Sequence, residues 1–322
     1  MTEITTVVTG ANIQPIIELV TNAVTSHHTK RAYQRALTDF MAWYATEQAK
    51  GKEGKANGFN KATVQAHVTD LREKGVSASS INQRLTAIRK LANELADTVI
   101  GKDEKGDPVT IITQGAAQAI GRVEGVRKEG KRLGNWLTKE QAQLLLELPN
   151  VSTVKGLRDR AILAILLGCG LRREECAKLT IGHIQQREAR WVIVDLVGKR
   201  SKTRSVPMPS WAKYAIDSYM VAGAITSGPL FRSMRRGDKL QGDGMTAQAI
   251  FNMVKEYAAQ IGVALAPHDL RRTFAKLAHK GSSPLEQIQL SLGHSSVQTT
   301  ERYIGVRQDL HSAPCDALGL RI

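Results

Sequence analysis

The sequence predicts a mainly α-helical protein with a small antiparallel β-sheet, built as a helical N-terminal domain followed by an α+β C-terminal domain. Three observations predict this class. Apolar residues recur at helical spacing along most of the chain. Only two short stretches, 191–197 and 205–208, have the residue pattern of strands. The length of 322 residues suffices for two domains, each with its own core.

The composition is that of a folded and strongly basic protein. Hydrophobic residues make up 42% of the chain, charged residues 23%, and the formal net charge is +15. Such a surface attracts polyanions, and nucleic acid is the commonest, although ribosomal, regulatory and membrane-surface proteins share this property. The longest apolar run, 161–167, is too short to span a bilayer, and no signal-peptide pattern is evident. We therefore expect no membrane partner.

The three cysteines, Cys169, Cys176 and Cys315, leave at least one thiol unpaired. This usage is typical of a reduced, cytoplasmic protein without a disulfide framework. The histidines lack the spacing and the cysteine neighbours of a zinc site, and the phosphate-binding pattern Gly-x-x-x-x-Gly-Lys is absent. We expect no metal and no other cofactor.

The N-terminal domain is predicted to span residues 13–120, after a flexible tail, 1–12. A short apolar-periodic stretch, 13–24, indicates its first helix. Ser26 and Thr29 are candidate caps for a second helix, in which apolar side chains recur every three or four residues.

A glycine- and lysine-rich loop, 51–58, precedes a third helix that ends at Gly75. Ser77 to Ser80 supply a cap for a fourth helix, whose apolar stripe over 81–91 is backed by basic side chains. Such an arrangement is usual for a core face backed by a solvated face. Further on, only a short helix over 116–120 is predicted, and residues 121–135 are expected to be an interdomain linker.

The C-terminal domain is predicted to span residues 136–322. It opens with a helix that Thr138 caps and that ends near residue 148, and a buried helix over 157–167 follows. The two predicted strands are joined by a basic turn, 198–204. Helices dominate the remainder of the domain.

Four local patterns in this domain carry chemistry, and the first two lie around Arg172 and in the basic turn. Arg172 and Glu175 are three residues apart at a predicted helix start, so the carboxylate can orient the guanidinium, although surface ion pairs share this spacing. Lys199 or Lys202 in the turn can donate a proton to a leaving oxygen. Spacing alone does not separate the two lysines, and many basic turns are merely solvated.

The third and fourth patterns are His268-x-x-Arg271 and Gly-His294 followed by Tyr303. His268 and Arg271 share a helical face, where an imidazole can transfer a proton and a guanidinium can bind phosphate oxygens. His294 is expected to end one helix, and Ser295 or Ser296 caps the next, which carries Tyr303. Tyrosines in helices are most often packing residues, so this pattern gains weight only from the others.

Taken together, these residues form a set that suffices for phosphoryl transfer without a metal ion. The arginines neutralise charge on phosphorus, the lysine and the imidazoles handle protons, and the phenol is a nucleophile. The set is Arg172, Lys199, His268, Arg271, His294 and Tyr303.

In this order and spacing, the residues resemble the tyrosine recombinase family, which includes phage integrases and Xer-type recombinases. The resemblance covers nearly the whole chain. It implies that the first domain is a SAM-like core-binding domain and that the second is the catalytic domain. Residues 26–44 and 77–91 look like helices of the DNA-binding domain. The basic residues expected to contact DNA are Lys30, Arg31, Arg35, Arg84, Arg89, Lys90, Lys202 and Arg204.

The resemblance implies site-specific recombination or integration of double-stranded DNA through a 3′-phosphotyrosine intermediate and a Holliday junction. It implies a homotetramer on two duplexes and a monomer or weak oligomer without DNA, and it leaves open whether accessory proteins take part. In this scheme Arg172 and Arg271 bind the scissile phosphate with His294, while His268 accepts the proton of Tyr303. Lys199 protonates the leaving oxygen, and Glu175 supports Arg172.

Two other functions remain at this point. A type IB topoisomerase uses nearly the same residues to nick and reseal one strand, and relaxation of any supercoiled plasmid would favour it. A DNA-binding regulator without catalysis would use the basic residues only to bind phosphate, and it would leave the set of six residues unexplained.

Overall fold

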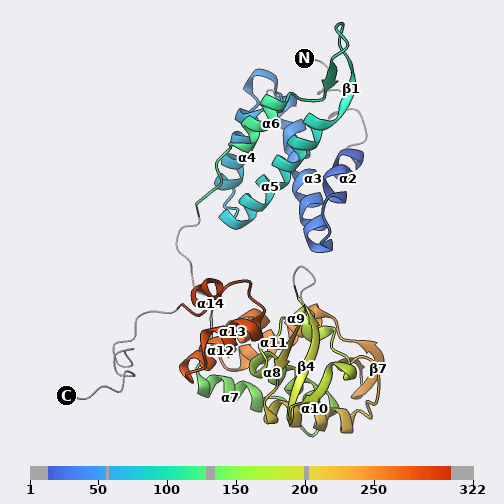
Figure 1. The fold of residues 1–322 in the computed structure, drawn as a ribbon, viewed down its shortest axis with the longest axis vertical. Helices are drawn as coiled ribbons and strands as arrows, with labels where there is room; N and C mark the ends of the chain where they lie inside the picture. Colours follow the sequence, from blue (N-terminus) through green and yellow to red (C-terminus); the bar gives the residue numbers. More distant parts are fainter. Residues whose placement is uncertain (1–13, 56–57, 128–134, 199–202, 306–322) are drawn as a thin grey trace, which may run out of the picture. The chain divides into compact units, whose positions relative to one another are not determined.

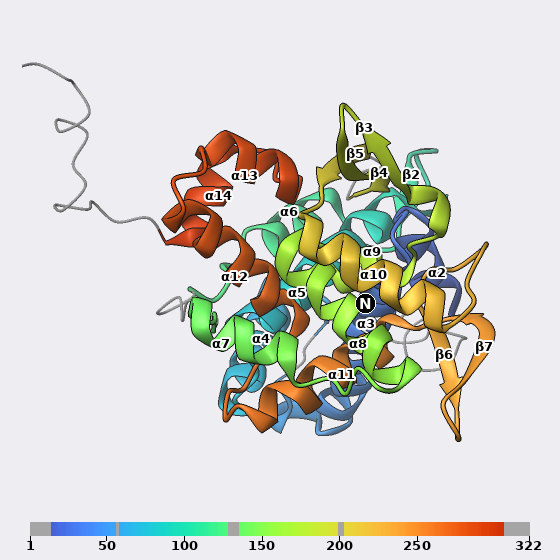
Figure 2. The same ribbon diagram turned by 90° about the horizontal axis from the view of Figure 1, so that it is seen from below.

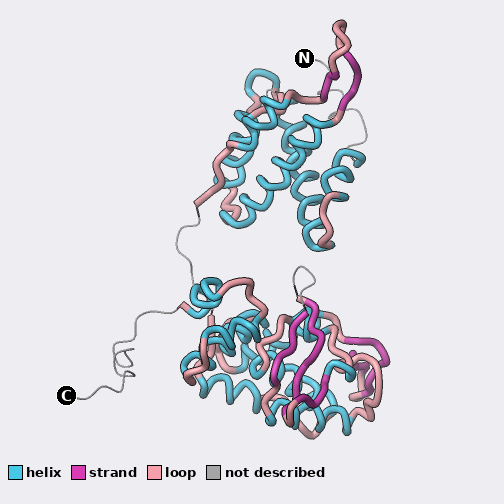
Figure 3. Tube along the Cα trace, in the orientation of Figure 1, coloured by secondary structure: helices cyan, strands magenta, loops and turns pink. Residues whose placement is uncertain are grey.

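The computed structural model describes residues 14–55, 58–127, 135–198 and 203–305 (Figure 1). The chain forms two compact units, one up to Lys131 and one from Arg132. Both are mainly helical with small antiparallel sheets, which confirms the predicted fold class (Figure 3). None of the described helices is long and apolar enough to cross a membrane.

Helices build the first unit, and most of them begin where the sequence predicts. The side chain of Ser77 accepts the Ser80 N–H and caps its helix as expected. Ser26 occupies an N-cap position without a side-chain cap bond, and Thr29 lies inside that helix. The elements are α2 (Gln14–Asn22), α3 (His27–Ala49), the short 3₁₀ helix η1 (Gly51–Glu53), α4 (Lys61–Glu73), α5 (Ala78–Asp97) and α6 (Gln114–Gly121).

The core of the first unit lies between α3, α4 and α5. The apolar stripes predicted from helical spacing face inward, and Leu37, Phe40, Leu85, Ile88 and Leu91 are fully buried. These stripes hold the basic side chains of α3 and α5 on the outer faces of the unit.

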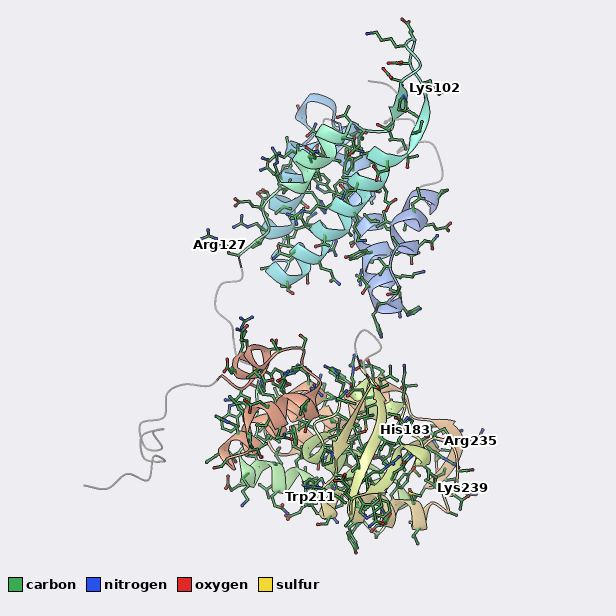
Figure 4. All side chains as sticks on the ribbon, in the orientation of Figure 1. Lys102, Arg127, His183, Trp211, Arg235 and Lys239 are labelled. Atoms are coloured by element: carbon green, nitrogen blue, oxygen red, sulfur yellow. The ribbon has the colours of Figure 1, made fainter. Side chains whose placement is uncertain are left out.

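A β-hairpin between α5 and α6 was not predicted. It pairs β1 (Val99–Lys102) with β2 (Pro108–Thr110), and Lys102 lies on its projecting part (Figure 4). The Asp103 carboxylate accepts the backbone N–H groups of Lys105 and Asp107 and so organises the turn. Because the strands are short and largely exposed, they lack the alternation by which strands are recognised.

The residues that follow α6 pack on the first unit, although they lie in the predicted linker. Val123 is buried, and its carbonyl accepts a hydrogen bond from Arg89. The Asn82 amide pairs with both backbone groups of Val126, at 2.8 and 2.9 Å. The chain up to Arg127 is therefore held by α5.

In the second unit, α8 runs through the middle and contacts α7, α10, α11 and α12 (Figure 2). Its side chains from Ala161 to Leu166 are buried on all sides, as its continuous apolar sequence predicts. The helices are α7 (Lys139–Glu147), α8 (Val154–Gly168), α9 (Arg173–Ala177), α10 (Ser210–Ala222), α11 (Ala247–Gln260), α12 (Pro267–Lys280), α13 (Leu285–Leu292) and α14 (Val297–Ile304), with a 3₁₀ turn η2 (Ile181–His183).

The sheet of the second unit has three strands in the order β3-β4-β5. The predicted strands are confirmed as β4 (Arg190–Val197) and β5 (Thr203–Pro207), and β3 (Ile184–Arg187) adds an unpredicted edge. A separate hairpin, β6 (Arg232–Arg235) with β7 (Lys239–Gly244), was also not predicted; Figure 4 labels Arg235 and Lys239 on it.

Candidate active site

The C-terminal helices of the second unit bring the predicted site residues together. Arg172 occupies the N-cap of α9, His268 and Arg271 lie on the first turns of α12, and His294 follows α13. Tyr303 lies near the end of α14, which Figure 1 shows beside α12 and α13. Lys199 and Lys202 lie outside the described residues, so the choice between them stays open.

Tyr303 is half-buried between two imidazoles, at the edge of a small apolar cluster. Its ring makes edge contacts with the rings of His268 and His294, with centroids 5.5 and 5.2 Å apart. Its hydroxyl donates to the backbone carbonyl of His268 at 3.1 Å. The guanidinium carbon of Arg272 lies 5.0 Å from the ring centroid, a contact that the sequence pattern did not predict.

The Tyr303 phenol is protonated at neutral pH. Burial raises its pKa above the ordinary value, and the charges of Arg271 and Arg272 oppose that effect only in part. A neutral phenol is a weak nucleophile, so attack from this position needs a group that accepts its proton.

The ion pair predicted from the spacing of Arg172 and Glu175 is present. Arg172 Nη1 lies 2.7 Å from Glu175 Oε1, and the Arg172 backbone N–H donates to Oε2 at 2.8 Å. Just before it, Gly170 has φ +61°, and a Cβ there would lie 2.5 Å from the Phe274 ring. Glycine is therefore required for the sharp turn that places Arg172 at the helix start.

Glu175 stays ionised although it is buried. Burial alone would raise its pKa, but hydrogen bonds from Arg204 and the Arg172 amide, with the charges of both arginines, lower it to about 2. A permanent carboxylate therefore holds two guanidinium groups in fixed positions.

Arg271 is fully buried and bound to backbone carbonyls. Its Nη1 donates to Gly170 O at 2.5 Å, and its Nη2 donates to Leu292 O. Its Nε has no hydrogen-bond partner among the described residues. Burial, followed by repulsion from Arg172, lowers its pKa to about 9, and the charge of Glu175 opposes this only in part.

The two imidazoles are neutral at pH 7. Burial and the charges of Arg271 and Arg172 lower the pKa of His294 to about 4, and burial with the Arg271 charge also lowers the pKa of His268. His294 Nδ1 lies 3.0 Å from Oγ1 of the fully buried Thr300, which fixes the orientation of the ring. The sequence did not distinguish Thr300 from the adjacent Thr299.

Arg204, which was predicted to contact DNA, has all three nitrogens of its guanidinium bound inside the protein, so that prediction stays a prediction. Nη1 and Nη2 each donate to Glu175 at 2.9 Å, and Nε donates to Ser291 O at 2.9 Å. The side chain is only 10% exposed. Its place in a basic stretch of sequence did not indicate which way the Arg204 side chain would point. Arg204 lies in β5, where successive side chains point to opposite faces of the sheet.

Two of the basic residues expected to contact DNA from the first unit are engaged within it. Arg84 forms an ion pair with Asp39 at 2.8 Å, and Arg89 binds the Val123 carbonyl. Arg31 and Arg35 are exposed on α3, and Lys30 and Lys90 are partly exposed. Three of these arginines line a groove of about 700 Å³ beside α3 and α5, made by Arg31, Gln34, Arg35, Ser80, Gln83 and Arg84 among others.

The resulting site is a cationic centre with polar donors around a phenol. In the part of the chain described, no group of His, Cys, Asp and Glu could hold a metal ion. The lowered pKa values of Arg271 and His294 have a common cause in burial and neighbouring positive charge. A bound phosphate diester would supply the missing negative charge.

Family comparisons match both units. Residues 135–309 match the phage integrase family, and residues 16–98 match the phage integrase N-terminal SAM-like domain. Tyrosine recombinase XerD of Pseudomonas aeruginosa is 30% identical over 298 residues, which cover 88% of this chain and 90% of that protein. Tyrosine recombinase XerC of Pelobacter propionicus is 30% identical, covering 92% and 93% respectively.

Solved structures share the fold. The XerH recombinase bound to its difH substrate before cleavage has a TM-score of 0.68 at 17% identity, covering 94% of this chain and 82% of that one. A lambda integrase dimer bound to a COC′ core site has a TM-score of 0.64 at 14% identity, covering 92% and 78%. At these identities the likeness is one of fold.

Proposed function

This chain belongs to the phage integrase family, the tyrosine recombinases, and on that premise we propose that Tyr303 is the residue that attacks DNA. As a member it is a DNA breaking-and-rejoining enzyme that carries out site-specific recombination. Neither the topoisomerase nor the non-catalytic regulator is favoured by these relatives.

The proposed reaction is the one that the family resemblance implies. The Tyr303 oxygen forms a bond to phosphorus, the bond from phosphorus to the 5′ oxygen breaks, and a 3′-phosphotyrosine results. Because the diester energy is kept in this bond, a 5′ hydroxyl from the partner duplex can reverse the step without ATP. Strand exchange in this way passes through a Holliday junction.

Each neighbouring group has a part in this step. His268 is neutral, partly open to solvent and packed edge-on against Tyr303, so it is suited to accept the phenol proton. Arg172 and Arg271 stabilise charge on the pentacoordinate phosphorus, and His294 donates to a non-bridging oxygen. Lys199 is the proposed donor to the leaving 5′ oxygen, with Lys202 as the alternative.

The observation that carries this assignment is the place of Tyr303 between His268 and His294, beside buried arginines. An ordinary packing tyrosine has neither two imidazole neighbours nor a buried guanidinium such as that of Arg271 close by.

The test is covalent trapping on suicide substrates. Nicked duplexes from DNA neighbouring the gene are incubated with protein in EDTA and resolved on a denaturing gel. Wild type and the control Tyr214→Phe, a change at an exposed tyrosine of α10, should give a covalent protein–DNA band, whereas Tyr303→Phe should give none. A band that persists in Tyr303→Phe, or cleavage that requires metal and leaves no band, would refute the assignment.

We also propose the partners and the setting of the reaction. Among proteins of the same fold, XerH is bound to its difH substrate and lambda integrase to a COC′ core site. By family resemblance, four copies of this chain would act on two duplexes, and without DNA the chain would be a monomer or weak oligomer. Light scattering with and without the nicked suicide duplex measures the oligomeric state. The buried free thiols of Cys169 and Cys176 support a cytoplasmic location.

A further inference from the structure

We infer that Arg204 is a positioning residue that holds Arg172 and the turn before His294 in their reactive arrangement. The inference rests on the function proposed for those two residues. It assigns Arg204 a part in catalysis without contact to DNA.

The first contact of Arg204 is with the carboxylate that orients Arg172. Arg204 binds both oxygens of Glu175 at 2.9 Å, and Glu175 binds the Arg172 side chain and backbone at 2.7 and 2.8 Å. One carboxylate therefore bridges two guanidinium groups. Because Arg204 takes part of its hydrogen-bonding capacity, Glu175 cannot turn both oxygens toward the Arg172 side chain, which keeps donors free for a phosphate.

The second contact is with the end of α13. Arg204 Nε donates to Ser291 O at 2.9 Å, and Arg271 donates to the next carbonyl, Leu292 O. Carbonyls in the last turn of a helix lack partners within the helix, and cations are favourable there. The two arginines thus fix the helix end from which His294 follows.

The stem of Arg204 also shapes the turn itself. Gly293 ends α13 in the left-handed conformation, with φ +63°, and a Cβ there would lie 2.9 Å from Arg204 Cδ. The backbone before His294 therefore packs directly on the Arg204 side chain. Through its head and its stem, this one residue joins α9, β5 and the turn that leads to His294.

Loss of Arg204 has a defined chemical consequence. Glu175 would pair fully with Arg172 and draw its guanidinium away from the phosphate, and the turn before His294 would loosen. Stabilisation of the negative non-bridging oxygens would then fall, while the bonds formed and broken stay the same. The defect should accordingly depend on the charge of the scissile phosphate.

The experiment compares single-turnover cleavage of the nicked suicide duplex by wild type, Arg204→Gln and Arg204→Lys. Two versions of the duplex are used, one with the natural scissile phosphate and one with a neutral methylphosphonate. Arg190→Gln, at an exposed arginine of the neighbouring strand β4, is the matched control. Binding of the duplex is measured in parallel, so that rates are compared at saturation.

We expect Arg204→Gln to slow cleavage of the natural duplex by about 100-fold, as for loss of a preorganised charge-stabilising group. On the methylphosphonate the deficit should shrink to less than about tenfold, because little charge remains to be stabilised. Arg204→Lys, which keeps the charge but cannot reach Glu175 and Ser291 together, should be intermediate. It also provides the comparison if the glutamine variant does not fold.

Two results would overturn the inference. Equal slowing on both duplexes would mean that Arg204 only supports folding, and unchanged cleavage would mean that it positions nothing. Absence of a covalent band with the wild type would instead refute the proposed function, and this inference with it.

Discussion

At the residue scale, His67 shows how burial sets the charge state of an ionisable group. It is 2% exposed in the core of the first unit, packed against the rings of Phe40 and Trp43, and neither ring nitrogen has a partner within the described chain. Burial lowers its pKa to about 4, with the charge of Asp70 opposing. The folded protein therefore holds this imidazole neutral.

Acid should consequently destabilise the first unit through His67. Between its unfolded pKa, about 6.5, and its folded pKa near 4, the unfolded chain binds a proton that the folded chain does not, so stability falls as pH falls through this window. Wild type should lose free energy of unfolding between pH 7 and about pH 4.5, and His67→Phe should remove about 2 kcal/mol of that loss.

Urea unfolding at the two pH values measures this difference. His28→Phe, at an exposed histidine of α3, is the control and should leave the loss as in wild type. An equal loss in His67→Phe and wild type would contradict the argument.

The sequence indicated which residues gather at the site, but it did not indicate what each of them contacts. Arg172, His268, Arg271, His294 and Tyr303 were all chosen from spacing, and the structure brings them together. The same reasoning did not predict the ion pair of Arg204 with Glu175 and gave no sign of Thr300 or Arg272. Residue type and spacing indicate chemistry, whereas the direction of a side chain depends on its neighbours in the fold.

At the element scale, turns place the site residues. Gly170 precedes Arg172 and Gly293 precedes His294, both with positive φ and both packed closely against a side chain. Helix ends were predicted well where a cap lies in the local sequence, as with Thr138, whose helix starts with a capping box. The β1–β2 and β6–β7 hairpins were missed because their strands are short and lack regular alternation.

Gly293→Ala should reduce stability and cleavage more than a glycine-to-alanine change at another residue of positive φ. Its Cβ would meet Arg204 Cδ at 2.9 Å, whereas at Gly262, with φ +70°, a Cβ would meet nothing within 4 Å. Gly262→Ala should therefore cost only the backbone strain, about 1 kcal/mol, and keep cleavage. Gly293→Ala should cost about 1–3 kcal/mol more from overpacking and lose most cleavage.

Thermal unfolding and single-turnover cleavage of both variants measure the difference. Equal stability losses with cleavage retained in both would show that the contact with Arg204 does not constrain the turn.

At the scale of the whole molecule, the basic side chains behind the net charge of +15 are of two kinds. Some are bound inside the units, as Arg89 is to a backbone carbonyl and Arg204 to a carboxylate. Others, such as Arg31 and Arg35, are exposed beside the groove of the first unit. Exposed cations of the second kind are the ones placed to displace counterions along the DNA backbone.

Salt dependence of DNA binding should distinguish these two kinds of cation. Arg35→Ala should reduce the slope of log affinity against log salt by about one, because one phosphate contact is lost. Arg89→Ala, which removes a cation bound within the unit, should leave the slope unchanged. Gel-shift titrations of the nicked suicide duplex over a range of salt concentrations measure both slopes. A reduced slope in Arg89→Ala alone would mean that Arg89, and not Arg35, contacts a phosphate.

The sequence by itself determined the helical elements and the two-part organisation, and it predicted the candidate site residues. These depend on local periodicity, caps and spacings of three residues, which act within one turn of helix. The tertiary structure decided the burial of Arg271, the bridge of Arg204 to Glu175 and the bond of Leu137 to Thr273, which join residues 101, 29 and 136 positions apart. The physical reason is that such contacts depend on how helices pack, and no local pattern records which distant group a side chain will meet.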